Sequence, residues 1–439
     1  MKALSILSVL VLGINLLLMG QSPDSIKNNR FSIHAQATVI NQTKLAFDAP
    51  YSGQNSLIAQ KENQTSITST LYAGVCLWKG ASVFINPEIA GGSGLSQALG
   101  VAAALNGETF RIGSPAPQIY LARLFWRQRF TLSKETISQE SNFNQLKENI
   151  PEKYLALTIG KIGLADFFDN NKYSHDPRTQ FTSWALMDAG AWDYAANTRG
   201  YTPSVVMEYI SPVHEIRYGL SLVPLTANGL KMNWNISKAS SHTLEYTHHH
   251  KVKTKEGAVR LLLFFTTANM GNYKKSIALN PQNPVIENTR VYGNTKYGFV
   301  INAEQGITNN LGAFVRASWN DGNNETWMFT EIDRSISAGF SLSGEKWNRK
   351  NDHIGLAYVT SGISKPHRDY LKAGGKGFIL GDGNLTYKYE QLTEFSYNAE
   401  VLKAGIYISG VYQFLLTPGY NHDRKGPVHI FSVRFHLVI

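Results

Sequence analysis

Three arginines at alternating positions of one short stretch form the residue set best suited to bind a polar solute. Arg123, Arg127 and Arg129 lie in the sequence YLARLFWRQRFT, in which most other positions are apolar. A guanidinium group offers five N–H donors in a fixed plane, and these donors can bind sugar hydroxyls or carboxylates. The alternative is that the arginines pair with nearby carboxylates and hold loops in place. The sequence keeps both alternatives open.

A second candidate group flanks a glycine-rich stretch that precedes the arginines. Five glycines between positions 91 and 107 let this stretch fold tightly back on itself. Glu88 and Glu108 would then form a mixed-charge constriction with Arg111 and Arg123. The alternative is a surface loop whose charges are solvated.

The stretch from Tyr173 to Tyr201 carries the third group, which combines rings with charges. Aromatic rings stack on the apolar faces of sugars, while Asp and Arg bind the hydroxyls. The candidates for sugar contact are Asp176, Arg178, Trp192 and Arg199. A self-packed loop, with Trp192 in a small core of its own, is an equal alternative. We expect a loop scaffold that lines part of an internal passage.

Other residue clusters do not support catalysis or metal binding. His248, His249 and His250 follow one another in an expected strand, so their side chains point to alternate faces. Asp166 and Asp169 could suggest a glycosidase acid pair, but no pocket can be argued around them. No serine nucleophile elbow, phosphate loop or zinc spacing is present in the sequence. We therefore expect no enzyme activity, no metal and no cofactor.

The elements that would position these residues are β-strands. The sequence predicts one face formed by Tyr120, Ala122, Leu124, Trp126, Gln128 and Phe130, opposite the three arginines. Similar alternation recurs in about sixteen segments of roughly ten residues, which is typical of a transmembrane antiparallel up-and-down β-barrel. Long connections, which would lie on the outer side or fold inward, are expected at Ile89–Gln118, Glu135–Glu152, Ala165–Thr202 and Gly271–Asn294.

The ends of the chain fit an exported barrel. Residues 1–20 have the pattern of a signal peptide, residues 21–30 would be a linker, and residues 31–439 would form the barrel domain. The final segment PVHIFSVRFHLVI alternates to the last residue and is expected to close the barrel. These features predict a bacterial outer-membrane location. The net charge of +10 is dispersed along the chain, so nucleic acid is not an expected partner.

Several longer stretches resemble the carbohydrate-selective outer-membrane porins of the OprB type. They are FSIHAQATVI, APYSGQNSL, LWKGASVFINPEIAGGSGLSQALGVAAALNGE, YLARLFWRQRF, YSHDPRTQFTSWALMDAGAWDYAANTRGYTPSVVMEY and PGYNHDRKGPVHIFSVRFHL. The resemblance implies a barrel of about sixteen strands, narrowed by inward loops. It also implies passive, sugar-preferring diffusion across a Gram-negative outer membrane. The terminal Ile439 and the region from Lys231 to Asn294 depart from the family pattern.

The expected function is passive, selective diffusion of small carbohydrates past arginine and aromatic side chains. The net positive charge permits a variant that prefers small anionic solutes such as sugar acids. A second alternative is a hydrolase built on an outer-membrane barrel, which would need a clustered nucleophile or acid pair. Besides the solute, the expected partner is outer-membrane lipid, and the sequence leaves a homo-oligomer open.

Overall fold

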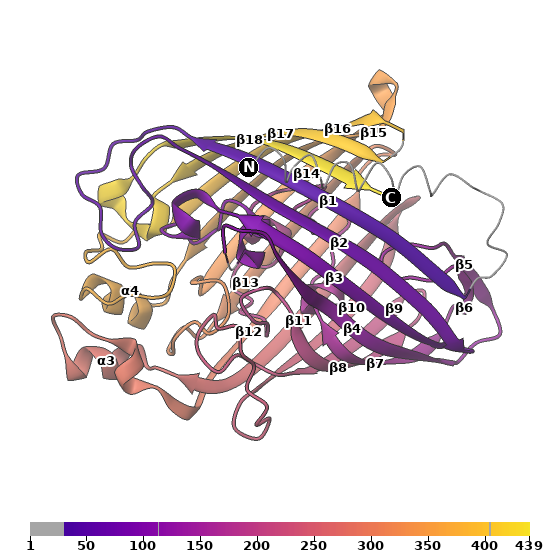
Figure 1. Cartoon of the computed structure of the whole chain (residues 1–439), viewed down its shortest axis with the longest axis horizontal. Helices are drawn as coiled ribbons and strands as arrows, with labels where there is room; N and C mark the ends of the chain where they lie inside the picture. Colours follow the sequence, from indigo (N-terminus) through magenta and orange to yellow (C-terminus); the bar gives the residue numbers. More distant parts are fainter. Residues whose placement is uncertain (1–29, 113, 404) are drawn as a thin grey trace.

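The computed structural model describes residues 30–112, 114–403 and 405–439. The expected signal peptide and all but the last residue of the expected linker lie outside the described residues. Within them, sixteen antiparallel strands form one closed barrel, as predicted (Figure 1). The barrel strands are β1 (Phe31–Lys44), β2 (Glu62–Trp78), β3 (Ala81–Gly92), β4 (Gln118–Thr131), β7 (Tyr154–Ile162), β8 (Thr202–Ile210), β9 (His214–Ser221), β10 (Ser240–Val252), β11 (Lys255–Met270), β12 (Val291–Gly306), β13 (Leu311–Asn320), β14 (Arg334–Gly344), β15 (Arg349–Gly362), β16 (Glu390–Leu402), β17 (Ile406–Leu416) and β18 (Val428–Val438).

Pairing between the first and last strands closes the barrel. β1 pairs with β18 along nine residue pairs, from Gln36 opposite Val438 to Lys44 opposite Ile430. The last residue extends this seam, because the N–H of Ile439 donates to the carbonyl of Ala35 at 2.9 Å. A closed sheet leaves no unpaired strand edge, which is what a bilayer demands of a spanning sheet.

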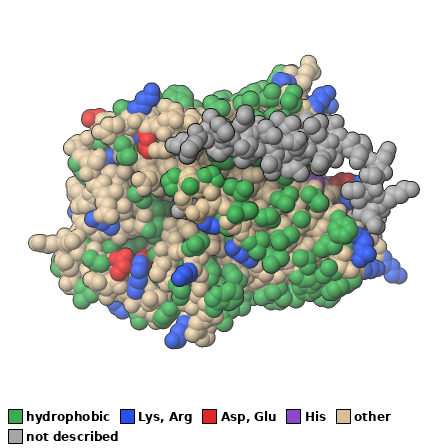
Figure 2. Space-filling view, viewed as in Figure 1, with side chains coloured by type: hydrophobic (Ala, Val, Ile, Leu, Met, Phe, Trp, Pro, Cys, Tyr) green, Lys and Arg blue, Asp and Glu red, His purple; other side chains and the backbone are tan. Residues whose placement is uncertain are grey.

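Alternation along each strand separates an apolar outer face from a mostly polar inner wall. In β14, Ser337 and Gly339 point inward and are buried, whereas Ile336 and Phe340 point outward and are more than half exposed. Figure 2 shows hydrophobic side chains spread over the visible outer face of the strands. Such a belt suits contact with lipid. Among the described residues, no helix is long and apolar enough to span a bilayer.

The two ends of the barrel differ in their connections. Short turns such as 211–213, 253–254 and 307–310 lie at one end, which we name the turn end. Long connections emerge at the other end, the loop end, and carry α3 (Tyr273–Leu279) and α4 (Lys365–Lys372) (Figure 1). The option that Glu135–Glu152 lies on the outer side is wrong, whereas its inward folding is confirmed by the stacking of Phe143 on the buried ring of Tyr72. This segment lies at the turn end and contains the hairpin β5 (Thr136–Gln139) and β6 (Glu148–Pro151).

One bulge shifts the predicted faces of β4. Asn86 pairs with Arg123 but Pro87 pairs with Leu121, so Ala122 is an extra residue on β4. Proline has no N–H to donate to a sheet ladder and is therefore found at such irregularities. As a result Tyr120 points inward, and its prediction on the same face as Leu124 is wrong. The inward direction of Arg123, Arg127 and Arg129 is confirmed.

Two connections fold into the barrel and build a core there. Residues 101–110 are buried, and so are residues 181–197, which include the short helix α2 (Trp184–Met187). Rings of Phe110, Trp184, Tyr194 and Phe329 pack together, with neighbouring centroids 4.9–5.8 Å apart. These loops therefore fill much of the interior near the loop end, and any passage must go around them.

Candidate functional site

The connection between β7 and β8, residues 163–201, is fixed to the inner wall by buried charges. We name it the inner segment. Arg316 on β13 donates to the Asp169 carboxylate at 3.2 Å and to the carbonyls of Ser174 and Leu186 at 2.6 and 3.0 Å. Both charged side chains are almost fully buried. Since an unpaired buried charge is costly, this pair fixes the position of the inner segment.

Further anchors come from β18 and β16, which lie at and near the seam where β1 pairs with β18. The Arg434 guanidinium on β18 donates to the carbonyls of Pro177 and Gln180 at 2.6 and 2.8 Å. The Glu394 carboxylate on β16 accepts from the backbone N–H groups of Thr182 and Ser183 at 2.6 and 3.0 Å. The inner segment is therefore held from β13, β16 and β18, far from its own strands in the sequence.

Two of the three predicted arginines are engaged in ion pairs. Arg123 binds Asp166 with two hydrogen bonds, each 2.6 Å long. The Asp166 side chain keeps 34% of its surface exposed, so this pair borders open space. Arg129 forms an ion pair with Glu148 on the β6 strand. These two contacts match the loop-holding alternative considered for the arginines.

Arg127 lies between these pairs and has a different environment. Its Nε donates to the Thr158 hydroxyl at 3.3 Å, and within the described part of the chain no carboxylate lies in ion-pair distance. Its guanidinium carbon lies 5.5 Å from the ring centre of Phe125 and 5.3 Å from that of Phe167. The side chain is only partly buried. Arg127 thus combines available donors with two flanking rings.

Charged residues on the neighbouring strands extend this surface towards the turn end. Arg217 on β9 pairs with Glu208 on β8 at 3.1 Å and with Glu215 at 2.6 Å, and all three side chains are partly exposed. Together with the arginines of β4 they form what we name the wall strip, which follows β4, β7, β8 and β9. Its members are Arg123, Arg127, Arg129, Asp166, Glu208, Glu215 and Arg217. Every arginine of the strip except Arg127 faces a carboxylate.

The predicted constriction group is rearranged around an arginine from the inner segment. Arg178 Nε donates to Glu108 at 3.1 Å, and its NH2 lies 3.7 Å from Glu88. The hydroxyl of Tyr201 donates to Glu88 at 3.0 Å. All of these side chains are buried. This cluster therefore joins two inward loops to each other, and the side chain of Arg111 lies outside the described residues.

The remaining predicted site residues of the inner segment support its internal structure. Trp192 is almost fully buried and packs against Phe168 and Tyr194, which matches the self-packed alternative. Burial alone would raise the pKa of the Asp176 carboxyl, but Arg178 and other partners hold this pKa below its usual value. Arg199 lies at the loop end of the segment, 3.9 Å from the ring centre of Tyr120.

Two chambers open at the turn end, on either side of Lys172 and Tyr173. The larger has a volume of about 740 Å³, and its lining includes Glu215 of the wall strip together with the carboxylates of Glu256 and Glu304. The smaller has a volume of about 530 Å³ and is lined by neutral polar side chains of β14 to β17. The wall strip therefore leads into the larger, charged chamber.

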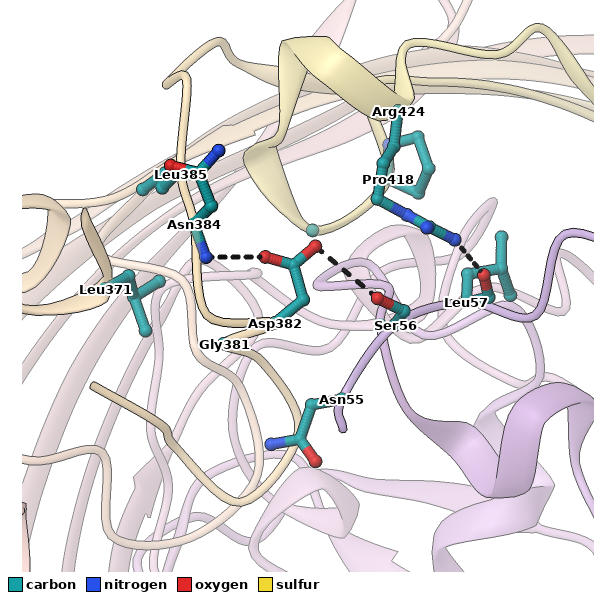
Figure 3. Close-up of a pocket in the computed structure, with 12 residues that line it drawn as sticks. Asn55, Ser56, Leu57, Leu371, Gly381, Asp382, Asn384, Leu385, Pro418 and Arg424 are labelled. Atoms are coloured by element: carbon teal, nitrogen blue, oxygen red, sulfur yellow. Dashed lines mark hydrogen bonds between the residues drawn. The ribbon is translucent and has the colours of Figure 1, made fainter. Parts of the chain in front are cut away.

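A small pocket at the loop end has a different character (Figure 3). The Ser56 hydroxyl donates to the Asp382 carboxylate at 3.5 Å, and Arg424 donates to the carbonyl of Leu57. The N–H of Asn384 also donates to Asp382, at 3.4 Å. The cavity has a volume of about 10 Å³, which is close to the space that one water requires. It joins three loops and cannot hold a sugar. Among the described residues no group of three metal-binding side chains is found.

Sequence reasoning missed several functional candidates for a common reason. Glu208 lies on β8, and Arg217 and Glu215 lie on the neighbouring strand β9. These residues lie near Arg127 only because β4, β7, β8 and β9 are neighbours in the barrel, which the local sequence does not indicate. A search for inward-facing charges on consecutive strands could have found them.

The chain is similar to known proteins at two levels. A family model described as "Carbohydrate-selective porin, OprB family" matches residues 54–438. The fold is similar to the high-pH structure of OprB from Pseudomonas putida, with a TM-score of 0.73, 16% identity, and coverage of 96% of this chain and 97% of that chain. It is also similar to the outer-membrane channel DcaP of Acinetobacter baumannii, with a TM-score of 0.50, 8% identity, and coverage of 93% and 97%. No curated protein sequence shows a significant match.

Proposed function

The chain belongs to the OprB family of carbohydrate-selective porins, and we propose that its sugars cross the barrel along the wall strip. It is an outer-membrane porin, a transport channel and not an enzyme, so the hydrolase alternative is set aside. Short turns of such barrels face the periplasm, so the turn end is the periplasmic end. The proposed path runs from the loop end past Asp166 and Arg127 into the larger chamber.

The environment of Arg127 is the observation that carries this path. Its donors are largely free of protein partners and its side chain is partly exposed, while the buried rings of Phe125 and Phe167 hold the guanidinium in place. Sugar hydroxyls can accept hydrogen bonds from these donors. Each such contact is weak, so the sugar can leave again, as diffusion requires.

The charge balance of the wall strip favours neutral sugars over sugar acids. Arg123, Arg129 and Arg217 each face a carboxylate, which leaves Arg127 as the one arginine of the strip without an ion pair. A path for anions would be expected to present several unpaired cations. We therefore propose neutral mono- and disaccharides as the preferred solutes, with sugar acids as the alternative.

Sugar block of single-channel current in planar bilayers tests the proposal. Glucose, maltose and glucuronate are compared on the wild type and on Arg127→Ala, with Arg334→Ala on the outer face of β14 as a matched control. We expect Arg127→Ala to weaken glucose block from both sides of the membrane and to raise cation permeability. Unchanged block and unchanged ion selectivity would remove Arg127 from the path. Block by glucuronate alone would favour the alternative.

Self-association is a separate part of the proposal. The apolar outer face could bind lipid alone or a second barrel as well. The mass of the detergent-solubilised protein distinguishes a single barrel from an oligomer.

A further inference from the structure

The smaller chamber at the turn end has the composition of a carbohydrate site, although the proposed path does not pass through it. Five side chains that line it, from four consecutive strands, are Ser341, Ser343, His353, Ser396 and Tyr407. In the described part of the structure none of these side chains has a hydrogen-bond partner. Their donors and acceptors are therefore available to a molecule in the chamber.

Two glycines make room for aromatic rings at the wall of the chamber. A Cβ atom at Gly312 would stand 2.0 Å from ring atoms of Tyr173, so the ring occupies the space that any other residue would fill. At Gly355, an added Cβ would come within 2.9 Å of the Phe181 ring. Tyr173, Phe181 and Tyr407 all line the chamber, which thus offers aromatic surface as well as hydroxyls.

The chamber differs in charge from its neighbour across Lys172 and Tyr173. Among the described residues no carboxylate lines it, whereas the lining of the larger chamber includes Glu152, Glu215, Glu256 and Glu304. Its volume of about 530 Å³ falls within the usual range for small-molecule sites. Lys172 at its border is the charged side chain among the described lining residues, and the hydroxyls and rings of the rest favour an uncharged sugar over an ion.

From these features we propose that the smaller chamber is a second binding site, for a neutral mono- or disaccharide, at the periplasmic end of the barrel. It is separate from the path along the wall strip. The sugar packs against Tyr407. Its hydroxyls exchange hydrogen bonds with His353 and with the serines of β14 and β16. Because the chamber opens at the turn end, sugar reaches it from the periplasmic side.

One-sided sugar addition in planar bilayers tests this site with the full-length mature protein. Two variants address the chamber: Ser343→Phe fills it, and His353→Ala combined with Ser341→Ala removes donors. His248→Ala, at the turn end of β10 but on its outer face, is the matched control. Native migration of the unheated protein in gels shows that each variant is folded.

We expect glucose block from the turn-end side to weaken about tenfold when His353→Ala and Ser341→Ala are combined, the effect of losing two hydrogen bonds, and at least as much in Ser343→Phe, whose ring occupies the space of the sugar. Block from the other side and the ion conductance should match the wild type, as should both blocks in the His248→Ala control. The site is refuted if glucose block from the turn-end side stays within about twofold of the wild type in both chamber variants while both are folded. Tighter one-sided block by glucuronate than by glucose, lost in the same variants, would also overturn the assignment to a neutral sugar.

The two proposals fail in distinguishable ways. Arg127→Ala affects block from both sides if the wall strip is the path, whereas the chamber variants affect one side only. A chamber effect without an Arg127 effect would therefore support the second site and refute the path. The reverse result would refute the second site alone.

Discussion

Arg123 on β4 and Asp166 on the inner segment face each other as a planar pair, joined by two hydrogen bonds of 2.6 Å. The arginine is almost buried, while the carboxylate remains partly exposed. Such a pair combines charge with fixed geometry, which a lysine cannot reproduce. This geometry fits a positioning role for Arg123, in contrast to the proposed solute contact of Arg127.

Replacing Arg123 should loosen the inner segment without removing the proposed sugar contact. We expect Arg123→Ala to destabilise docking of residues 163–170 by about 2 kcal/mol, because two charge-assisted hydrogen bonds are lost. Arg123→Lys should recover only part of this loss. Hydrogen exchange of the 163–170 peptides measures the effect. Exchange equal to that of the wild type in both variants would contradict the positioning role.

Arg316 is expected to have a larger structural effect, because both it and Asp169 are almost fully buried. Arg316→Leu leaves the Asp169 charge without its main partner, a change that costs about 4 kcal/mol in comparable buried pairs. Residues 169–187 should then exchange amide protons at least tenfold faster. Arg334→Leu on β14 is the control, since Arg334 is exposed and donates to the carbonyl of Ile363. Equal protection in both variants would refute the anchoring role.

Gly312 offers a test of the partition between the two chambers. Because a Cβ would overlap the Tyr173 ring, Gly312→Ala should displace that ring and connect the chambers. We expect a higher single-channel conductance. Gly410→Ala is the control, because no atom lies within 4 Å of an added Cβ there. The double variant Gly312→Ala with Tyr173→Ala should retain the high conductance, and a wild-type conductance in all of these variants would contradict the partition.

Glu331 should make one loop contact depend on pH. Its carboxylate accepts from the N–H groups of Ile379 and Leu380 at 3.0 and 2.6 Å. Burial raises the pKa of Glu331 to about 7, although His367, these N–H groups and Lys296 oppose the shift. A raised pKa in the folded state means that the contact is most stable below the unfolded pKa near 4.5. It weakens as the pH rises through about 7.

Hydrogen exchange of residues 376–385 between pH 4.5 and 7, corrected for intrinsic rates, checks this expectation. Protection should fall with rising pH in the wild type, whereas Glu331→Gln should remove the dependence because glutamine has no proton to lose. The neighbouring Asp333 does not interfere in this window, since His367 helps to hold its pKa at about 2 against the effect of burial. If protection of residues 376–385 still falls with rising pH in Glu331→Gln, another titrating group is the cause.

Much of the fold followed from local pattern. Alternation predicts the strands and the inward direction of Arg123, Arg127 and Arg129, because the side-chain direction depends only on neighbouring residues. The same rule was wrong at Tyr120, where the bulge opposite Pro87 inserts one residue and reverses the faces. A proline within an expected strand was the available signal.

The candidate site was less predictable, because its contacts join distant parts of the chain. Arg178 meets Glu88 and Glu108 across 90 and 70 positions, and nothing local to any of them indicates that meeting. Trp192 was a candidate for sugar contact by residue type, yet it lies in an aromatic core that only the folded loops create. The sequence pattern predicts to which face of a strand a side chain points. Which residue it contacts depends on the order of the strands and the path of the loops.

The Arg434 contact implies an order of assembly. Arg434 belongs to the last strand, and it holds the carbonyls of Pro177 and Gln180 in a segment that follows β7. These groups are more than 250 positions apart in the chain, and closing such long loops is slow. These two contacts of the inner segment cannot form before β18 is in place. A barrel arrested before closure would therefore hold the inner segment from β13 and β16 but not from β18, and its internal obstruction would be less firmly fixed than in the finished protein.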